Sequence, residues 1–431
     1  MSASSPTDRS EPFKAPVGTR DVLPPESTRW QALIAAFARQ VAGAGYGLVQ
    51  SPMFEEFGVF ARVGEGTDLV RKEMYDFVDK GDRHLALRPE GTASIARAYV
   101  QHRPATPWKV WYAAPSFRYE RPQAGRYRQH HQLGLEAIGS DDPDLDVEVM
   151  VLLHDFYASI GLRRFSLLVN SMGTAEDRLR YVADVREWLS VRADHLDPTD
   201  AAKIADHPLR VLDSKRPQTI EAITEVPRIT DRLSDAATAR FERVTAGLTA
   251  SGVDFRVEPR LVRGLDYYTH TTFEFVSDAL DAAQSTIGGG GRYDGLITSL
   301  GGPDTPGIGF GSGIERVLLS CDAEGVFAAP DSLVDVYVVD TTGGEAARDL
   351  VTELRRAGIA TDRAFDGRSM KSQMKSADRS GATLVCIIGD DERAAGSITI
   401  RDLRSDTGQA TVDRTDAIAS ISERLARQDQ P

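Results

Sequence analysis

Arginines gather in one short stretch of the sequence, where two strand-like runs flank a loop. Residues 117–136 read Phe-Arg-Tyr-Glu-Arg-Pro-Gln-Ala-Gly-Arg-Tyr-Arg-Gln-His-His-Gln-Leu-Gly-Leu-Glu. If the runs pair as antiparallel strands, alternate side chains of each strand lie on one face of the sheet. Arg118 and Gln132 could then contact a common ligand. Glu136 lies on the same face as Gln132, further along the strand. Arginine binds phosphate oxygens without proton transfer, as phosphoryl or adenylyl transfer mostly requires. The stretch therefore predicts a triphosphate site. The alternative is a charged hairpin whose side chains only form salt bridges with one another.

A second run alternates glycine with larger residues and ends in a charged pair. Residues 307–316 read Gly-Ile-Gly-Phe-Gly-Ser-Gly-Ile-Glu-Arg. Glycines at alternate positions leave one face of a strand bare, so a flat ring can lie on the backbone. A helix should begin near Gly313 and place Arg316 one turn from its positive end, where anionic oxygens are favoured. The run is neither a P-loop nor Gly-x-Gly-x-x-Gly, so neither a P-loop nor a Rossmann site is supported.

A third run, residues 261–269, reads Leu-Val-Arg-Gly-Leu-Asp-Tyr-Tyr-Thr. Arg263 offers a forked, permanently charged donor for phosphate or carboxylate oxygens. Tyr267 and Tyr268 add flat faces that each carry a hydroxyl group. Taken alone, the run also suits a surface turn between strands with half-buried tyrosines.

These runs need a sheet to position them, and the sequence around them reads as one. A helix is predicted at 27–44, and a strand-like run at 46–50 stops at Pro52, which suits only the edge or end of a strand. One helix, at 92–101, interrupts the strand-like runs that follow, at 74–78, 84–87, 109–114 and 133–138.

The middle and end of the chain have different patterns. After a helix at 145–159 and a strand at 165–169, the charged stretch 172–252 predicts an inserted helical module, with helices at 176–189 and 228–248. Strand-like sequence resumes at 255 and ends near 311, before a helix at 313–321. Beyond a loose segment, strands alternate with helices, which predicts a small α/β domain with a partly parallel sheet; its elements are expected at 334–339, 345–356, 360–361, 369–377, 383–388, 398–400 and 417–425.

Composition limits the class of protein. The 431 residues, 41% of them hydrophobic and 27% charged, predict a globular protein of two or three domains. No apolar run approaches the roughly 18 residues of a membrane span, so no membrane partner is expected. The polar residues 1–16 read as a loose tail and not as a secretory signal. Cys321 and Cys386 stand far apart, which predicts neither a disulfide framework nor a thiolate zinc site and fits a reducing cytoplasm.

Charge is uneven along the chain. A net charge of −13 argues against a basic coat for general nucleic-acid binding. Six basic residues and one acid lie between Arg103 and Arg128, and five basic residues and two acids between Arg363 and Arg379. Such islands suit a partner whose phosphates are bound at defined places. A solvated helix face is an equal alternative for the second island.

Together, the arginine-rich stretch and the glycine run resemble the second and third signature motifs of class II aminoacyl-tRNA synthetases, and the run before Pro52 suits the first. The third run and Gly-Gly-Arg-Tyr-Asp-Gly-Leu at 290–296 look like the specific signatures of the histidyl-tRNA synthetase family. Further matches are Gly-Thr-Arg-Asp-Val-Leu-Pro at 18–24, Leu-Arg-Pro-Glu-Gly-Thr at 87–92 and Leu-Arg-Val-Leu-Asp-Ser-Lys at 209–215. The resemblance extends from Gly18 to the last helix, though the tail matches in pattern more than in motif.

The resemblance implies an α+β catalytic core, an antiparallel sheet with flanking helices and a helical insertion, followed by a small α/β C-terminal domain. Composition predicts the disordered tail at 1–16, and the resemblance implies the core at 17–325 with its insertion at 172–252 over the tRNA acceptor arm, and an anticodon-binding domain at 333–431. The implied partners are L-histidine, ATP, histidine tRNA and a second copy of the chain in a homodimer.

The resemblance also implies a histidine site. Glu90, Thr92 and Gln132 would hold the α-ammonium group, and Glu136 with Tyr268 would read the imidazole. The full implied set is Glu90, Gly91, Thr92, Gln132, Glu136, Tyr267, Tyr268 and Tyr293.

For ATP, the resemblance places Arg118 and Arg263 on opposite sides of the α-phosphate as the catalytic residues. Arg316 would hold the γ-phosphate, helped by Arg126 and Arg128 on the loop, and Glu120 is a further residue of the implied ATP site. His130 stands where the family usually has a phenylalanine stacked on adenine, so weaker or pH-sensitive ATP binding is expected. Mg²⁺ is expected with ATP, and no protein metal site is expected, because the eight histidines show no zinc-binding spacing.

The implied reaction is ATP-dependent ligation of histidine to its tRNA through a histidyl-adenylate. The alternative is a non-catalytic, histidine-sensing regulatory paralogue of histidine biosynthesis. By resemblance, such paralogues lack the anticodon-binding tail and degrade the signature at 261–269, and both features are present here.

Overall fold

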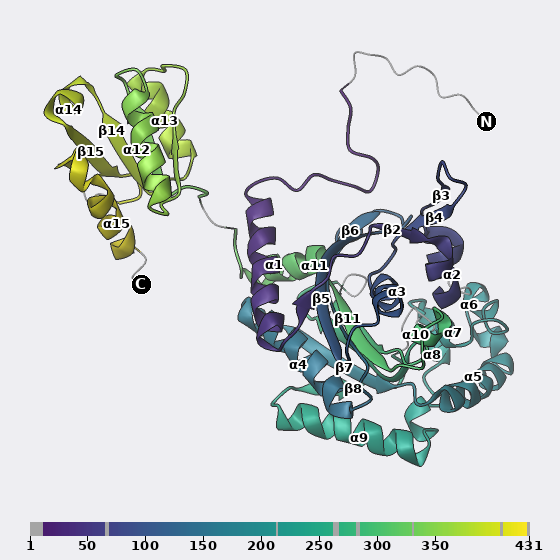
Figure 1. Cartoon of the computed structure of the whole chain (residues 1–431). Helices are drawn as coiled ribbons and strands as arrows, with labels where there is room; N and C mark the ends of the chain where they lie inside the picture. The colour runs from purple at the N-terminus through teal and green to yellow at the C-terminus, as the bar shows by residue number, and fades with distance from the viewer. Residues whose placement is uncertain are drawn as a thin grey trace. The chain divides into compact units, whose positions relative to one another are not determined.

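The computed structural model describes residues 12–64, 69–212, 214–261, 267–281, 285–329, 332–405 and 408–428. The chain divides into two compact units (Figure 1). The first holds the residues up to Val22 and Trp30–Ala328, and the second holds Leu23–Arg29 and the chain from Ala329 onward.

An eight-stranded sheet organises the first unit. Its strands lie in the order β1-β5-β6-β11-β10-β9-β7-β8. Neighbours from β5 to β7 are antiparallel, while β1 and β8 pair in parallel at the two edges. This confirms the predicted antiparallel core sheet. The strands are β1 Gly47–Leu48, β5 Trp108–Phe117, β6 Gln129–Ile138, β7 Phe165–Ser171, β8 Phe255–Val257, β9 Thr269–Ser277, β10 Thr286–Arg292 and β11 Gly307–Gly313.

Helices cover both faces of this sheet because its strands alternate apolar side chains to each side. In β6, Leu133 and Leu135 pack with the helices of one face, and Ile138 packs with the other. Figure 1 shows α1 and α4 on one side of the sheet and α3 on the other. The first face carries α1 Glu26–Gly43, α4 Pro143–Ser159 and α11 Ile314–Glu324, and the second carries α3 Thr92–His102 and α10 Leu296–Ser299.

A small three-stranded sheet adjoins α3. It consists of β2 Phe54–Glu56, β4 His84–Leu87 and β3 Asp76–Val78, with α2 Phe57–Gly64 and a π-helical turn at Leu69–Glu73. The predicted strand at 84–87 has these bounds, whereas α2 was not predicted. Half-buried Arg97 of α3 pairs with buried Glu55 of β2 at 2.6 Å, which ties this small sheet to α3.

The inserted module has its own small core, centred on Tyr181, Val185 and Leu189 of α5. The prediction that α9 belongs to this module was incomplete, because Val244 and Leu248 of α9 pack into the core of the main sheet. That helix also begins later than predicted. The elements here are α5 Ala175–Ser190, α6 Pro198–Ala201, α7 Leu209–Leu212, α8 Pro217–Ala222 and α9 Asp235–Ala250, with 3₁₀ turns at Ala193–His195 and Ile229–Asp231.

The second unit is a five-stranded mixed sheet in the order β13-β12-β14-β15-β16. Strand β12 runs parallel to β13 and β14, and the last three strands are antiparallel, so the predicted partly parallel sheet is confirmed. Strand β16 was missed because its sequence, Gln-Ala-Thr-Val-Asp, is that of a polar edge strand. The elements are β12 Val336–Asp340, α12 Glu345–Arg356, β13 Thr361–Arg363, α13 Met370–Arg379, β14 Leu384–Ile388, α14 Asp390–Ala395, β15 Ser397–Asp402, β16 Gln409–Asp413, a 3₁₀ turn Arg414–Asp416 and α15 Ala417–Gln428.

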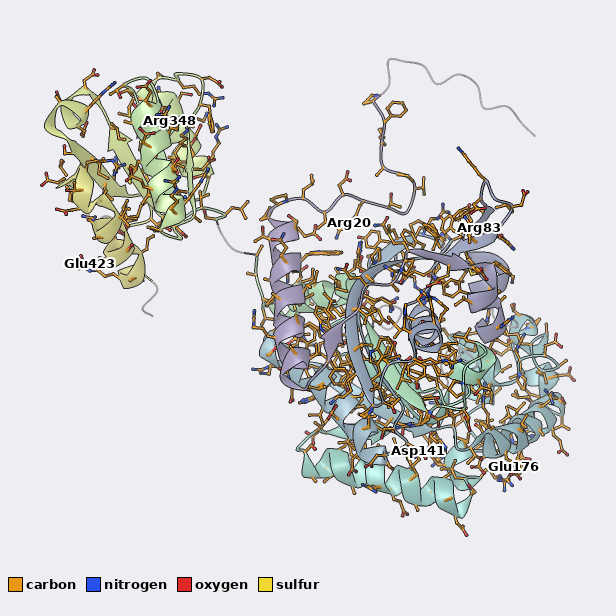
Figure 2. All side chains as sticks on the ribbon, viewed as in Figure 1. Arg20, Arg83, Asp141, Glu176, Arg348 and Glu423 are labelled. Carbon is orange, nitrogen blue, oxygen red and sulfur yellow. The ribbon has the colours of Figure 1, made fainter. Side chains whose placement is uncertain are left out.

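A buried ion pair fixes the end of β10. Arg292 and Asp146 of α4 are both fully buried, and the Arg292 Nε lies 3.1 Å from a carboxylate oxygen of Asp146, with a second contact through Nη2. Thr271 of β9 donates to the other oxygen at 2.6 Å. Arg240 of α9 lies 3.6 Å away and also binds Asp141, which Figure 2 labels. Two strands and two helices therefore meet at one carboxylate.

Asp146→Asn is expected to destabilise the first unit by about 3–5 kcal/mol, because it leaves the Arg292 charge buried without its partner. Urea or thermal unfolding measures this loss. Asp144→Asn is the matched control, since Asp144 lies two residues earlier on the same helix, also pairs with an arginine, Arg243, and is largely exposed. Equal stability of the two variants would contradict the role of the buried pair.

Candidate active site

The register of β6 places the predicted site residues on one face of the sheet. His130, Gln132 and Glu136 alternate along the strand, and β11 lies beside it in antiparallel register. Glu136 pairs with Gly309, and Gln132 pairs with Gly313. Since β11 carries no side chain at its glycines, the longer side chains of β6 extend over it.

Glu136 lies at the closed end of the site. Its carboxyl group is fully buried and accepts hydrogen bonds from the Thr92 hydroxyl at 2.7 Å and the Tyr293 hydroxyl at 2.6 Å. The Tyr112 hydroxyl approaches the same group at 3.4 Å. Burial raises the pKa of Glu136 to about 8, although the hydrogen bonds from Tyr293 and Thr92 favour its charged form. A group with this pKa can hold or release a proton near neutral pH.

Glu90 caps the helix that borders this pocket. Its two carboxylate oxygens accept the backbone N–H groups of Thr92 at 2.6 Å and Ala93 at 2.8 Å, at the first turn of α3. Burial raises the pKa of Glu90, while these backbone donors oppose the shift. Glu90 is therefore held rigidly beside the Thr92–Glu136 hydrogen bond.

Tyrosines wall the pocket. The Tyr267 ring centroid lies 4.7 Å from that of Tyr268 and 6.1 Å from that of Tyr293, and the latter two rings are buried. Tyr112 of β5 completes the wall and was missed in the sequence. Its alternation with Arg118 along one strand could have identified it, because residues 112 and 118 share a face.

Glycines make room for these rings. A Cβ atom at Gly91 or at Gly134 would overlap the Tyr112 ring. A Cβ atom at Gly307 would overlap Tyr293, and one at Gly309 would overlap the Glu136 carboxyl group. The predicted bare face of β11 is thus covered by protein at Gly307 and Gly309, and it opens only toward Gly313.

An open cleft of about 370 Å³ adjoins the pocket along the same strands. Its charged lining combines three arginines with three glutamates: Arg118, Arg126, Arg316, Glu120, Glu274 and Glu315. The remaining lining is polar or glycine except for Ile287, and consists of Tyr127, His130, Gln132, Thr286 and the glycines at 125, 288, 289, 311 and 313. A groove with this lining suits a polyanion that lies on exposed backbone.

The three arginines are held by backbone carbonyl groups or by a loop carboxylate. The Arg118 Nε donates to Pro89 O at 2.8 Å. Arg316 donates to Thr286 O at 3.0 Å and to Gly125 O at 3.2 Å, from the first turn of α11 as predicted. Arg126 lies 3.3 Å from Glu120. Burial lowers the pKa of Arg316, and the neighbouring Arg126 acts in the same direction, so the cleft is electrostatically prepared for anions.

The buried residues around Glu136 and the arginine cleft share strand β6, so a buried carboxyl group and an open, arginine-lined cleft lie along one strand. A family model described as Histidyl-tRNA synthetase matches residues 18–317. The chain belongs to the histidyl-tRNA synthetase family. A second family model, described as an anticodon binding domain, matches residues 334–424.

Similar proteins cover nearly the whole chain. The histidine–tRNA ligase of Corynebacterium urealyticum is 47% identical over 424 residues, which are 96% of this chain and 98% of the relative. The apo histidyl-tRNA synthetase structure from S. aureus has a TM-score of 0.79 at 35% identity and covers 95% of this chain and 99% of that one. A Bacillus halodurans structure, described as an ATP phosphoribosyltransferase regulatory subunit/histidyl-tRNA synthetase, has a TM-score of 0.63 at 20% identity and covers 88% of this chain and 98% of that one. At that identity the likeness shows the shared fold alone.

The structure brings together most of the residues that the family resemblance implied. Gly91, Thr92, Glu136, Tyr268 and Tyr293 surround the pocket, with Glu90, Tyr267 and Gln132 at its margins. Thr92, expected to face the α-ammonium group, donates its hydroxyl hydrogen to Glu136, which leaves the hydroxyl oxygen able to accept. Arg263 lies outside the described residues.

Among the described residues, Arg128 is the expected ATP residue that does not line the cleft. Its guanidinium carbon lies 3.9 Å from the Tyr119 ring centroid, and its Nε donates to Glu120 O at 3.3 Å. The sequence pattern could not reveal this, because residues 119–128 form a loop without strand alternation.

His130 lines the cleft as expected but carries a different charge state. Removal from water, with the positive charge of Arg118 beside it, lowers the pKa of His130 to about 3. This shift favours a neutral imidazole in the physiological range, so weaker ATP binding is expected at this position without a dependence on pH.

The described residues were compared with the requirements of a metal site and of a membrane span. None of their His, Cys, Asp and Glu side chains form a group of three or more that could hold a metal ion. None of their helices is long and apolar enough to cross a membrane.

The raised pKa of Glu136 predicts a pH-dependent histidine KM. Below about pH 8 the carboxyl group keeps its proton, and above it the carboxylate accepts a stronger hydrogen bond from an imidazole N–H. The histidine KM should therefore fall as the pH rises through about 8, and Glu136→Gln should remove that titration. Titration of histidine itself is common to both proteins, so identical pH profiles would contradict this assignment.

His130→Phe is expected to lower the KM for ATP by about two- to tenfold, because a larger aromatic face adds about 0.5–1.5 kcal/mol of stacking. Since the imidazole stays neutral, the ratio of the two KM values should be constant from about pH 6 to about pH 8. Steady-state kinetics across this range measure the ratio. A ratio that changes with pH would show that His130 titrates.

Proposed function

We propose that this chain ligates L-histidine to histidine tRNA, with ATP converted to AMP and pyrophosphate. The observation that carries the proposal is the arrangement on β6, where the buried Glu136 group ends one site and the arginine cleft begins another. One bound molecule that extends along the strand would place an imidazole at Glu136 and a carboxylate near Arg118.

In the first step, a carboxylate oxygen of histidine attacks the α-phosphorus of ATP. A bond forms between them, the bond from the α-phosphorus to the bridging oxygen breaks, and pyrophosphate leaves. Arg118 would stabilise the charge on the α-phosphate, and Arg263, by family resemblance, would approach from the other side. No side-chain base is required, because the attacking carboxylate is already ionised; orientation and charge stabilisation do the work.

In the second step, a hydroxyl of the terminal tRNA ribose attacks the histidyl carbonyl carbon. The new ester bond forms, the bond to the phosphate of AMP breaks, and AMP leaves with its phosphate taking up the hydroxyl proton. Arg316 would by then have released pyrophosphate, whose γ-phosphate end it holds in the first step. Mg²⁺ would enter with ATP on the β- and γ-phosphates, and the cleft glutamates supply oxygen atoms of the kind it prefers.

Selection of histidine would rest on the two ring nitrogens. Glu136 and Tyr268 would each satisfy one nitrogen inside a pocket that excludes water. An amino acid without these nitrogens would leave buried polar groups unpaired, which discriminates more strongly than the loss of an apolar contact.

The tRNA would contact two further parts of the chain. The second unit, with domain bounds proposed at 333–431, would bind the anticodon, and Lys371, Lys375 and Arg379 recur at helical spacing along α13. The inserted module at 172–252 would cover the acceptor arm. We place the protein in the cytoplasm, where its two free and buried cysteines stay reduced.

A homodimer is the expected assembly. Strand β1 is an edge of the main sheet, and Leu48 on it is 54% exposed. Met53 and Phe54, which follow along the chain, are similarly exposed. A second copy of the chain over this edge would bury these apolar side chains.

Histidine-dependent exchange between ATP and pyrophosphate tests the function. The wild-type chain should exchange, and Arg118→Ala should lower the rate by about 100- to 1,000-fold with little change in the histidine KM. Arg83→Ala is the control, because Arg83 is an exposed arginine paired with Asp79 on the small sheet. No exchange by folded wild-type protein would instead favour the histidine-sensing regulatory alternative.

A further inference from the structure

The motif Gly-Thr-Arg at 18–20 has no part in either site. It lies in a segment that we name the N-terminal strap, residues 16–22, which precedes α1. The strap begins with a tight turn, in which the backbone N–H and the hydroxyl of Thr19 both donate to Pro16 O, at 3.0 and 2.8 Å. The turn directs the carbonyl group of Gly18 toward the loop at residues 119–128, which borders the cleft.

Backbone hydrogen bonds connect the strap to Arg118. The Arg128 N–H donates to Gly18 O at 2.8 Å, and the Arg118 N–H donates to Arg128 O at 2.8 Å. The strap, the end of the cleft loop and the start of that loop therefore lie side by side. Arg118 is one hydrogen-bonded neighbour away from the strap.

The contact with Arg128 requires a glycine at position 18. Its φ of +84° is a conformation that glycine adopts without strain. A Cβ atom there would lie 2.6 Å from the Cγ atom of Arg128. Arg128 is in turn stacked on Tyr119 at 3.9 Å, so it has Gly18 on one side and a ring at its other end.

Arg20 makes a second attachment. Its guanidinium carbon lies 5.3 Å from the centroid of the Tyr127 ring and 6.0 Å from that of Trp30. Tyr127 lines the cleft, and Trp30 meets His131 edge to face at 4.8 Å. Figure 2 labels Arg20 in the segment that leads into α1. The strap thus holds the cleft loop at two successive residues, Tyr127 and Arg128.

We propose that the N-terminal strap is a positioning element for the ATP half of the active site. It fixes the loop that carries Arg126 and Tyr127 and the strand end that carries Arg118. Arg128 acts through this packing, as a positioning residue that does not touch the nucleotide. The inference rests on the proposed adenylation, and it predicts selectivity: strap variants should impair the use of ATP and spare histidine, whose pocket lies at the far end of β6.

Gly18→Ala tests the strap. It should raise the ATP KM about tenfold or more in the exchange assay, because displacement of positioned groups by about 1 Å is costly, and it should change the histidine KM less than about twofold. Gly252→Ala is the matched control, since Gly252 has a similar φ of +71° but nothing within 4 Å of its added Cβ. The control should leave both KM values unchanged.

A double-mutant cycle distinguishes positioning from general damage. If Gly18 acts through Arg128, the Gly18→Ala/Arg128→Ala protein should have an ATP KM no higher than that of Arg128→Ala alone. Arg20→Ala, which adds no strain, should raise the ATP KM in the same direction. Thermal unfolding of each variant verifies that it folds.

The two proposals fail differently. Absence of exchange by the wild-type protein would refute the proposed function. Exchange by the wild-type protein with an unchanged ATP KM in both Gly18→Ala and Arg20→Ala would overturn the strap. An equal rise of the ATP and histidine KM values would also overturn it, because that result indicates a purely structural role.

Discussion

The alternation of side chains along β6 is the constraint on which the site depends. This strand is paired on both sides, to β5 and to β11, so its register is fixed twice. From His130 to Glu136 the strand advances about 20 Å at roughly 3.3 Å per residue. Within that length it presents an imidazole at the cleft, an amide in the middle and a buried carboxyl group at the end. A slip of one residue would turn all of them to the opposite face.

Two buried carboxyl groups, those of Asp146 and Glu136, have different roles because their partners differ. Asp146 is neutralised by Arg292 inside the protein, and their ion pair holds β10 against α4. Glu136 is equally buried but is met only by hydroxyl groups, and its pKa rises to about 8. The first group is complete without a ligand. The second has no cationic partner and keeps its proton at neutral pH, and a carboxyl group with so strongly raised a pKa is a common physical mark of a binding site.

The periodicity of apolar residues in the sequence predicted the regular helices and strands. It predicted the helix at 345–356 and the strand at 84–87, and it placed Gln132 and Glu136 on one face. It could not show that Glu136 and Tyr293 would cover half of the glycine run, because that depends on which neighbouring strands pair. Nor could it orient Arg128, which lies in an irregular loop. Tyr112 was within reach of the same alternation argument and was overlooked for lack of any polar neighbour in its run.

The glycines beneath the pocket limit how its substrate could change. Gly91 and Gly134 lie under Tyr112, while Gly307 and Gly309 lie under Tyr293 and Glu136. The backbone on this side has no side chain left to trim. A larger amino acid could therefore be admitted only by shortening one of the tyrosines, which would remove a wall or a hydroxyl that binds Glu136. For protein engineering, no residue beneath the pocket can be made smaller, because these positions are already glycine. A change of specificity must therefore replace a tyrosine of the wall together with Glu136.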